Sequence, residues 1–79
     1  MKVLLDQETN VVIDIVDETR QVSNGLQVLK NDDIYIYASI IPITTIEKDV
    51  IPEGVSAQKY MYVNEEFVLN PDYVEPNNA

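Results

Sequence analysis

Short runs of strand-favouring residues, separated by turn formers, recur along the chain and predict β-hairpins. The pattern is clearest in residues 60–63 and 66–70, which are separated by Asn64 and Glu65. Asparagine tolerates the positive φ angle that a two-residue hairpin loop needs. This loop pairs Tyr62 with Phe67 and Tyr60 with Leu69, which gathers four large side chains on one face. The other face carries Met61, Val63 and Val68, so we expect both faces to be covered, by the chain itself or by a second copy.

A second hairpin is predicted near the N-terminus, from residues 2–6 and 11–16. A three-residue loop, with Asn10 in the left-handed conformation, gives the register. The expected pairs are Leu5 with Ile13 and Val3 with Ile15. One face then carries Val3, Leu5, Val11, Ile13 and Ile15.

The next segment, residues 17–24, fits two alternatives. A hairpin turn at Asn24 and Gly25 would set Val22 opposite Gln27, which matches the faces poorly. A single helical turn capped by Asp17 and stopped by Gly25 is the other option. We expect an irregular or short strand-like linker here.

The middle of the chain predicts a third hairpin, from residues 26–29 and 34–38 around a four-residue loop, 30–33. Its register sets Val28 opposite Tyr35 and Leu26 opposite Tyr37. The reverse face carries Leu29, Ile34 and Ile36, so these strands are apolar on both sides.

Prolines shape the segment that follows. Pro42 and Pro52 interrupt an isoleucine-rich run and favour a short strand at a sheet edge, residues 43–47. A turn is expected at residues 52–54, with positive φ at Gly54. The sequence therefore predicts an all-β fold, a small antiparallel sheet, sandwich or barrel of five to six short strands. We expect a single domain, residues 1–73, followed by a flexible tail, residues 74–79.

Size and composition point to self-association. A chain of 79 residues buries only about 60 to 65 per cent of its unfolded surface. It has no cysteine, so neither disulfides nor thiolate metal sites add stability. No apolar run approaches the roughly 20 residues of a membrane span, and acidic residues follow the N-terminus too soon for a signal peptide. We expect a cytoplasmic protein that does not bind membranes.

The net charge of the chain limits the classes of partner that it can bind. Fourteen acidic and five basic side chains give a net charge of −9, which argues against binding nucleic acid directly. One hypothesis is mimicry of DNA by ordered carboxylates. The other is a solvated acidic surface that keeps an apolar small protein soluble. The acids fall mostly at predicted turns, which favours the second.

Candidate chemistry is sparse. Without histidine or cysteine, the usual nucleophile–base pairs and imidazole metal sites are absent. The nearest carboxylate pairs, Asp14 with Asp17 and Asp32 with Asp33, are more typical of turns, and no calcium-loop spacing or glycine-rich phosphate cradle is present. We expect no enzyme activity, no catalytic residue, no metal and no cofactor. The aromatic positions instead suggest a protein interface. Our candidates are Tyr60, Tyr62, Phe67 and Leu69, followed by Tyr35 and Tyr37.

The order of features resembles a group of small proteins encoded in phages and prophages of Gram-positive bacteria, often near tail-fibre, baseplate and lysis genes. The features are KVLLDQETNVV, VSNGLQVL, DIYIYA, IPEGV and KYMYVNEEFVLNPDY. The resemblance covers most of the chain and includes no catalytic signature. It implies a phage structural or tail-associated accessory protein that acts by protein contacts. The partners would be further copies or a tail protein, in the bacterial host cytoplasm or in the virion. The alternative is a small acidic inhibitor of a host protein, such as a DNA mimic.

Overall fold

A computed structural model describes residues 1–74, which form eight strands and no helix. The all-β prediction is therefore confirmed, with more strands than the five to six expected. No helix in this range is long and apolar enough to cross a membrane. The tail predicted for residues 74–79 lies, except for Val74, outside the described residues. The strands are β1 (Lys2–Asp6), β2 (Val12–Val16), β3 (Glu18–Val22), β4 (Gly25–Lys30), β5 (Asp33–Ala38), β6 (Ile43–Glu47), β7 (Tyr60–Val63) and β8 (Glu66–Leu69).

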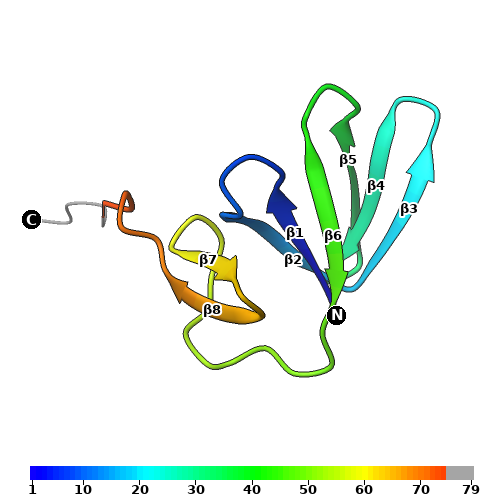
Figure 1. Ribbon diagram of the computed structural model, residues 1–79. Coiled ribbons are helices and arrows are strands. Elements are labelled where there is room, and N and C mark those ends of the chain that lie inside the picture. Colours follow the sequence, from blue (N-terminus) through cyan, green and yellow to red (C-terminus); the bar gives the residue numbers. More distant parts are fainter. Residues whose placement is uncertain (75–79) are drawn as a thin grey trace, which may run out of the picture.

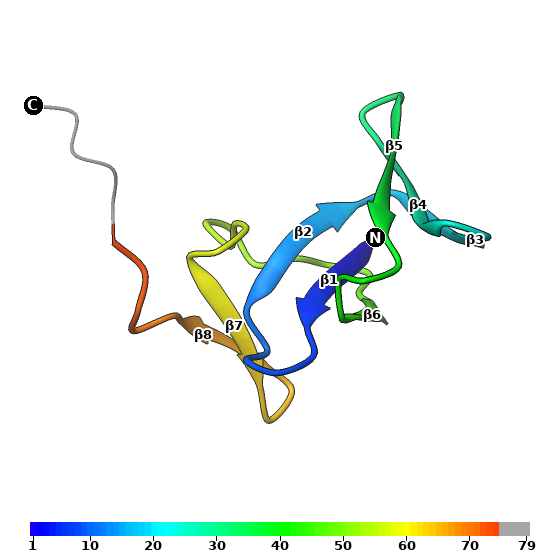
Figure 2. The same ribbon diagram turned by 90° about the horizontal axis from the view of Figure 1, so that it is seen from above.

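These strands form three small antiparallel sheets, in the orders β2-β1-β6, β3-β4-β5 and β7-β8. The sheet that contains β1 lies in the middle, with the β7–β8 hairpin on one side and the β3–β4–β5 sheet on the other (Figures 1 and 2). The terminal hairpin is thus one cover of a central sheet.

Two apolar clusters join the layers. The hairpin-side cluster consists of Val3, Leu5 and Val12, with Ile15, Ile46, Ile51, Tyr60, Tyr62 and Phe67 packed against them. The sheet-side cluster consists of Leu4, Val16 and Val28, with Ile13, Leu26, Tyr35, Tyr37 and Ile43 packed against them. Because side chains alternate along a strand, β1 contributes to both clusters and is buried on both faces.

A bulge in the first hairpin corrects the predicted register. Asn10 is left-handed as expected, with φ 63°, and Val3 pairs with Ile15. Leu5, however, pairs with Val12 and not with Ile13, because the register shifts after Leu4. A β-bulge sets two residues of one strand against one of its partner. It turns Val12 toward the hairpin-side cluster and leaves Ile13 on the other side.

The segment 17–24, predicted as an irregular or short strand-like linker, contains a regular short strand, and its helical alternative is wrong. Residues 18–22 form β3, which pairs with β4 so that Val22 lies opposite Gly25. The turn is therefore Ser23-Asn24, one residue earlier than the Asn24-Gly25 turn that we considered. This shift sets Thr19 opposite Val28 and Arg20 opposite Gln27, while Gln21 lies opposite Leu26.

The remaining hairpins follow the prediction. The pairs Val28–Tyr35, Leu26–Tyr37, Tyr62–Phe67 and Tyr60–Leu69 all form. The loop after β4 shortens to Asn31-Asp32, both with positive φ. The predicted strand 43–47 is β6 at the edge of the central sheet. The turn at residues 52–54 also forms, since Val55 N–H donates to the Pro52 carbonyl at 3.2 Å.

The β7–β8 hairpin is held to β2 by backbone contacts as well as by side chains. Gln58 N–H donates to the Val12 carbonyl at 2.7 Å, and Tyr62 N–H donates to the Asn10 carbonyl at 2.9 Å. An isolated bridge also pairs Val11 with Met61. The edge of β2 is therefore occupied.

The Tyr37 backbone lies so close to residue 25 that only glycine fits there, and a substitution at this position tests the corrected register. A Cβ there would lie 2.0 Å from the Tyr37 carbonyl oxygen, and the φ of 150° is unfavourable for other residues. We expect Gly25→Ala to lower the free energy of unfolding by at least about 3 kcal/mol, measured by urea denaturation. Gly54→Ala is the control, because its φ is also positive but its nearest neighbour is 4.0 Å away; it should cost about 1 to 2 kcal/mol. Equal losses would contradict the close approach.

Candidate protein-binding surface

The predicted interface residues of the last hairpin lie mostly inside the molecule. Tyr60, Tyr62 and Phe67 are half-buried against the hairpin-side cluster. The Tyr62 and Phe67 ring centroids are 4.9 Å apart, and Lys48 Nζ lies 4.8 Å from the centroid of Tyr62. Leu69 alone of the four is well exposed, at 62%. Three of these residues therefore cover the chain's own core.

Tyr35 and Tyr37 are also turned inward, toward a buried carboxylate on β2. Their hydroxyls donate to Asp14 Oδ2 at 2.5 and 2.6 Å, and their rings meet edge to face. Asp14 Oδ1 accepts from Lys30 Nζ at 2.8 Å and from the Ile15 N–H at 2.9 Å. The carboxylate thus joins the central sheet to the β3–β4–β5 sheet.

The same contacts set the ionisation of this group. Burial raises the pKa of the Asp14 carboxyl, but the hydrogen bonds from Lys30, Tyr35 and Tyr37 outweigh burial, so the pKa is lowered. Burial and the neighbouring carboxylate raise the pKa of Tyr37 and of Tyr35. At neutral pH the carboxylate is charged and each tyrosine keeps its proton for donation.

The carboxylate pairs weighed as catalytic candidates do not come together as a site. Asp14 accepts from four donors, while the Asp17 Oδ2 accepts the Asn31 N–H at 3.1 Å near the β4–β5 turn. Asp32 and Asp33 are exposed at the same turn. No group of three or more acidic side chains suited to a metal ion occurs in residues 1–74. Asp14 acts as a structural anchor between two sheets.

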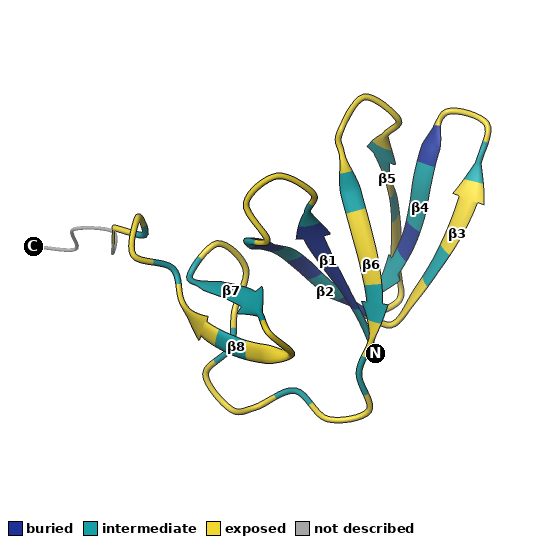
Figure 3. Cartoon of the chain, viewed as in Figure 1, coloured by how far each residue is buried: buried dark blue, intermediate teal, exposed yellow. Residues whose placement is uncertain are grey.

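Four of the exposed large apolar side chains lie on β5 and the loop after it. The exposed fractions are 65% for Ile34, 44% for Ile36, 88% for Ile40 and 39% for Ile41. They belong to the longest stretch of the sequence without a charged side chain, residues 34–46. Figure 3 shows exposed positions along β5 and the following loop, while the buried positions concentrate on β1, β2 and β4. The lack of charge in this stretch is the sequence signal for its exposed isoleucines, which our candidate list did not include.

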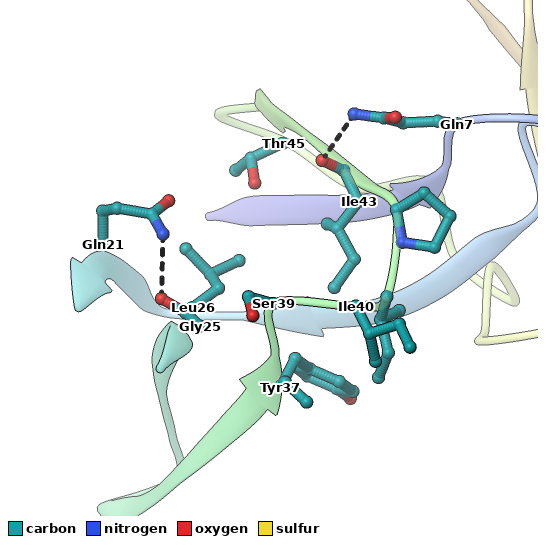
Figure 4. Close-up of a pocket in the computed structure, with 12 residues that line it drawn as sticks. Gln7, Gln21, Gly25, Leu26, Tyr37, Ser39, Ile40, Ile43 and Thr45 are labelled. Atoms are coloured by element: carbon teal, nitrogen blue, oxygen red, sulfur yellow. Dashed lines mark hydrogen bonds between the residues drawn. The ribbon is translucent and has the colours of Figure 1, made fainter. Parts of the chain in front are cut away.

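A hollow of about 400 Å³ adjoins this surface, where β5 passes into β6 (Figure 4). The side-chain amides at its rim are used internally: Gln7 donates to the Ile43 carbonyl at 3.2 Å and Gln21 to the Gly25 carbonyl at 3.0 Å. Its lining includes the side chains of Leu26, Tyr37, Ile40 and Ile43. This mixed, open lining suits contact with a protein better than enclosure of a small molecule.

The chain matches no family model, no curated protein and no solved structure with which it was compared. The functional argument therefore depends on the exposed surface and the residues that form it.

Removing the charge of Asp14 tests its anchoring role. We expect Asp14→Asn to lower the free energy of unfolding by about 2 to 3 kcal/mol at pH 7, because Lys30 loses its charged partner inside the contact. The pKa of Asp14 is lower in the folded state than in the unfolded state. The stability that its carboxylate contributes is therefore fully present above the unfolded pKa near 4 and is lost as pH falls through the folded pKa. The difference in free energy of unfolding between wild type and Asp14→Asn, measured by urea denaturation, should therefore disappear in acid. A gap independent of pH would argue against the anchor.

Replacing Tyr62 and Phe67 together by serine separates core from interface. Since both rings pack on the hairpin-side cluster, we expect the double variant to lose at least about 3 kcal/mol of stability, seen as a lower melting temperature by circular dichroism. Leu69→Ser, at an exposed position of the same hairpin, is the control and should change stability little. If the double variant melts at the wild-type temperature and an oligomer dissociates, these two rings form an interface and not part of the core.

Proposed function

We propose that the chain is a non-enzymatic protein-binding domain, an accessory component of the tail or baseplate region of a phage. The observation that carries the protein-binding role is the exposure of Ile34, Ile36 and Ile40 on one uncharged stretch. Exposed apolar side chains grouped in this way are typical of interaction surfaces. The resemblance to small phage proteins supplies the tail assignment.

The charge of the molecule is consistent with this role. On a chain with a net charge of −9, an uncharged surface lets a partner approach without strong repulsion. The acidic side chains keep the remainder solvated and limit unspecific association. Specific contact through one surface is then favoured.

The alternative, an inhibitor that mimics DNA, has weaker support. DNA mimicry needs carboxylates in a regular row, as phosphates are in the duplex. Exposed acids here lie at separate turns: Asp32 and Asp33 after β4, Glu53 beside Gly54 in the segment between β6 and β7, and Glu65 and Glu66 after β7. Their distribution follows the loops and suits solvation.

Association with phage particles tests the proposal. In a lysogen that encodes the chain, particles are purified by density gradient after induction, and the chain is measured by mass spectrometry. We expect it in the particle fraction, with the double variant Ile34→Lys, Ile36→Lys depleted more than about tenfold, because charge at a desolvated contact weakens binding. Val50→Lys introduces the same charged side chain at a loop position that is 78% exposed, and this variant should remain in the particle fraction.

Recovery of the wild-type chain only among free proteins would contradict the tail assignment. Salt-sensitive binding of that free chain to a DNA-handling enzyme would favour the inhibitor instead.

A further inference from the structure

We infer that the outer edge of β5 pairs antiparallel with the same edge of a second copy, forming a continuous six-stranded sheet across a twofold axis. This inference rests on the proposed function and identifies the surface and the partner: a second copy of this chain.

The backbone of β5 offers an open hydrogen-bonding edge. β5 ends the order β3-β4-β5, and no described strand pairs with its other side. Figure 2 shows that the β4–β5 hairpin points away from β6. A strand edge of this kind is a template for another strand.

The groups that face outward can be assigned. Ser39 N–H donates to the Asn24 carbonyl at 3.2 Å, which continues the β4–β5 register. Hydrogen-bonded and non-hydrogen-bonded pairs alternate in an antiparallel ladder, so Tyr35 and Tyr37 bond to β4. The N–H and C=O of Ile34 and Ile36 therefore point to the open edge. The carbonyl of Ala38 already accepts the Ile41 N–H at 3.0 Å.

One register satisfies all of these free groups. When Ile34 lies opposite Ile36 of the second copy, each exchanges its N–H and C=O with the other, and Tyr35 lies on the twofold axis. The segment Ile34-Tyr35-Ile36 reads the same in both chain directions, so isoleucine meets isoleucine on the outer face. Cross-strand pairs of this kind stabilise a sheet.

Charge permits this pairing between two acidic chains. The nearest acid on the strand, Asp33, would lie opposite Tyr37 of the second copy. Its distance from the other Asp33 along the strand is about 14 Å, at 3.4 Å per residue, which exceeds the Debye length of about 8 Å in physiological salt. Like charges are thus kept apart at the contact.

The free edges of β3 and β6, the other outer strands of the two three-stranded sheets, are less suited to pairing. β3, which would flank the combined sheet on both sides, carries Glu18 and Arg20, and charged edges resist further strand addition. The exposed side chains of β6 are threonines and Glu47, with no exposed isoleucine. A twofold contact uses one patch on each copy and closes.

Sedimentation velocity over a concentration series tests the inference. We expect the wild-type chain to sediment as a dimer, at twice 9.0 kDa. Ile34→Lys should raise the dimer dissociation constant more than about tenfold, because it places a charge beside the neighbouring isoleucine. Leu69→Lys is matched in size and exposure, 62% against 65%, and should leave the dimer intact.

Ile36→Pro provides an independent variant. Proline removes an N–H that points away from β4, so the internal ladder is kept while the outer edge is blocked. We expect a monomer whose far-ultraviolet circular dichroism matches that of the wild type. A dimer that persists in folded Ile36→Pro, or that dissociates in Leu69→Lys but not in Ile34→Lys, would overturn the inference. So would a wild-type monomer throughout the series.

These outcomes separate the inference from the proposed function. A monomer that still purifies with phage particles would end the β5 pairing and leave the tail assignment standing. A β5-paired dimer that is absent from phage particles would support the β5 pairing and contradict the tail assignment.

Discussion

A strand buried on both faces is the constraint on which the rest of the structure depends. In β1, Leu4 faces the β3–β4–β5 sheet, while Val3 and Leu5 face the β7–β8 hairpin. A strand with apolar residues on both sides is stable only if each face is covered. The chain supplies both covers from its own hairpins, which is why so short a sequence forms three thin layers. Because the apolar residues are used for these inner contacts, no strand in residues 1–74 remains to cover the outer face of β5.

Asp14 shows how the layers are aligned as well as covered. It is the only charged residue in residues 1–74 that is buried, and its carboxylate accepts hydrogen bonds from the hydroxyls of Tyr35 and Tyr37 on the facing sheet. Apolar contacts are non-directional and tolerate sliding, whereas short charge-assisted hydrogen bonds do not. The carboxylate therefore fixes the position of β5 relative to β2. It also explains why both tyrosines, which the sequence offered as interface candidates, are committed inside the molecule.

Local signals in the sequence were sufficient for much of the fold. The hairpins built on Asn31-Asp32 and Asn64-Glu65 have two-residue turns, and their side-chain parity leaves one register that matches the faces. The sequence did not predict the bulge at Ile13 or the turn before Gly25, because contacts between layers decide both. Val12 packs in the hairpin-side cluster, and Gly25 lies against the Tyr37 carbonyl. The same limit applies to the site. Parity showed that Tyr62 and Ile36 both lie on apolar faces, but the stacking of layers decides which face is covered.

The residues left uncovered are those that intramolecular folding does not explain. At 65% exposure, Ile34 contributes little to the core, and a charged residue there would protect the strand edge at small cost to folding. β3, on the opposite edge of the same sheet, has such protection in Glu18 and Arg20. One sheet therefore has a charged edge and an uncharged, isoleucine-bearing edge. A sheet guarded at both edges would remain alone, and one open at both would extend into a fibre. A sheet open at one edge joins a single neighbour, and by that contact β5 gains hydrogen-bond partners for its free edge and cross-strand isoleucine neighbours for Ile34 and Ile36.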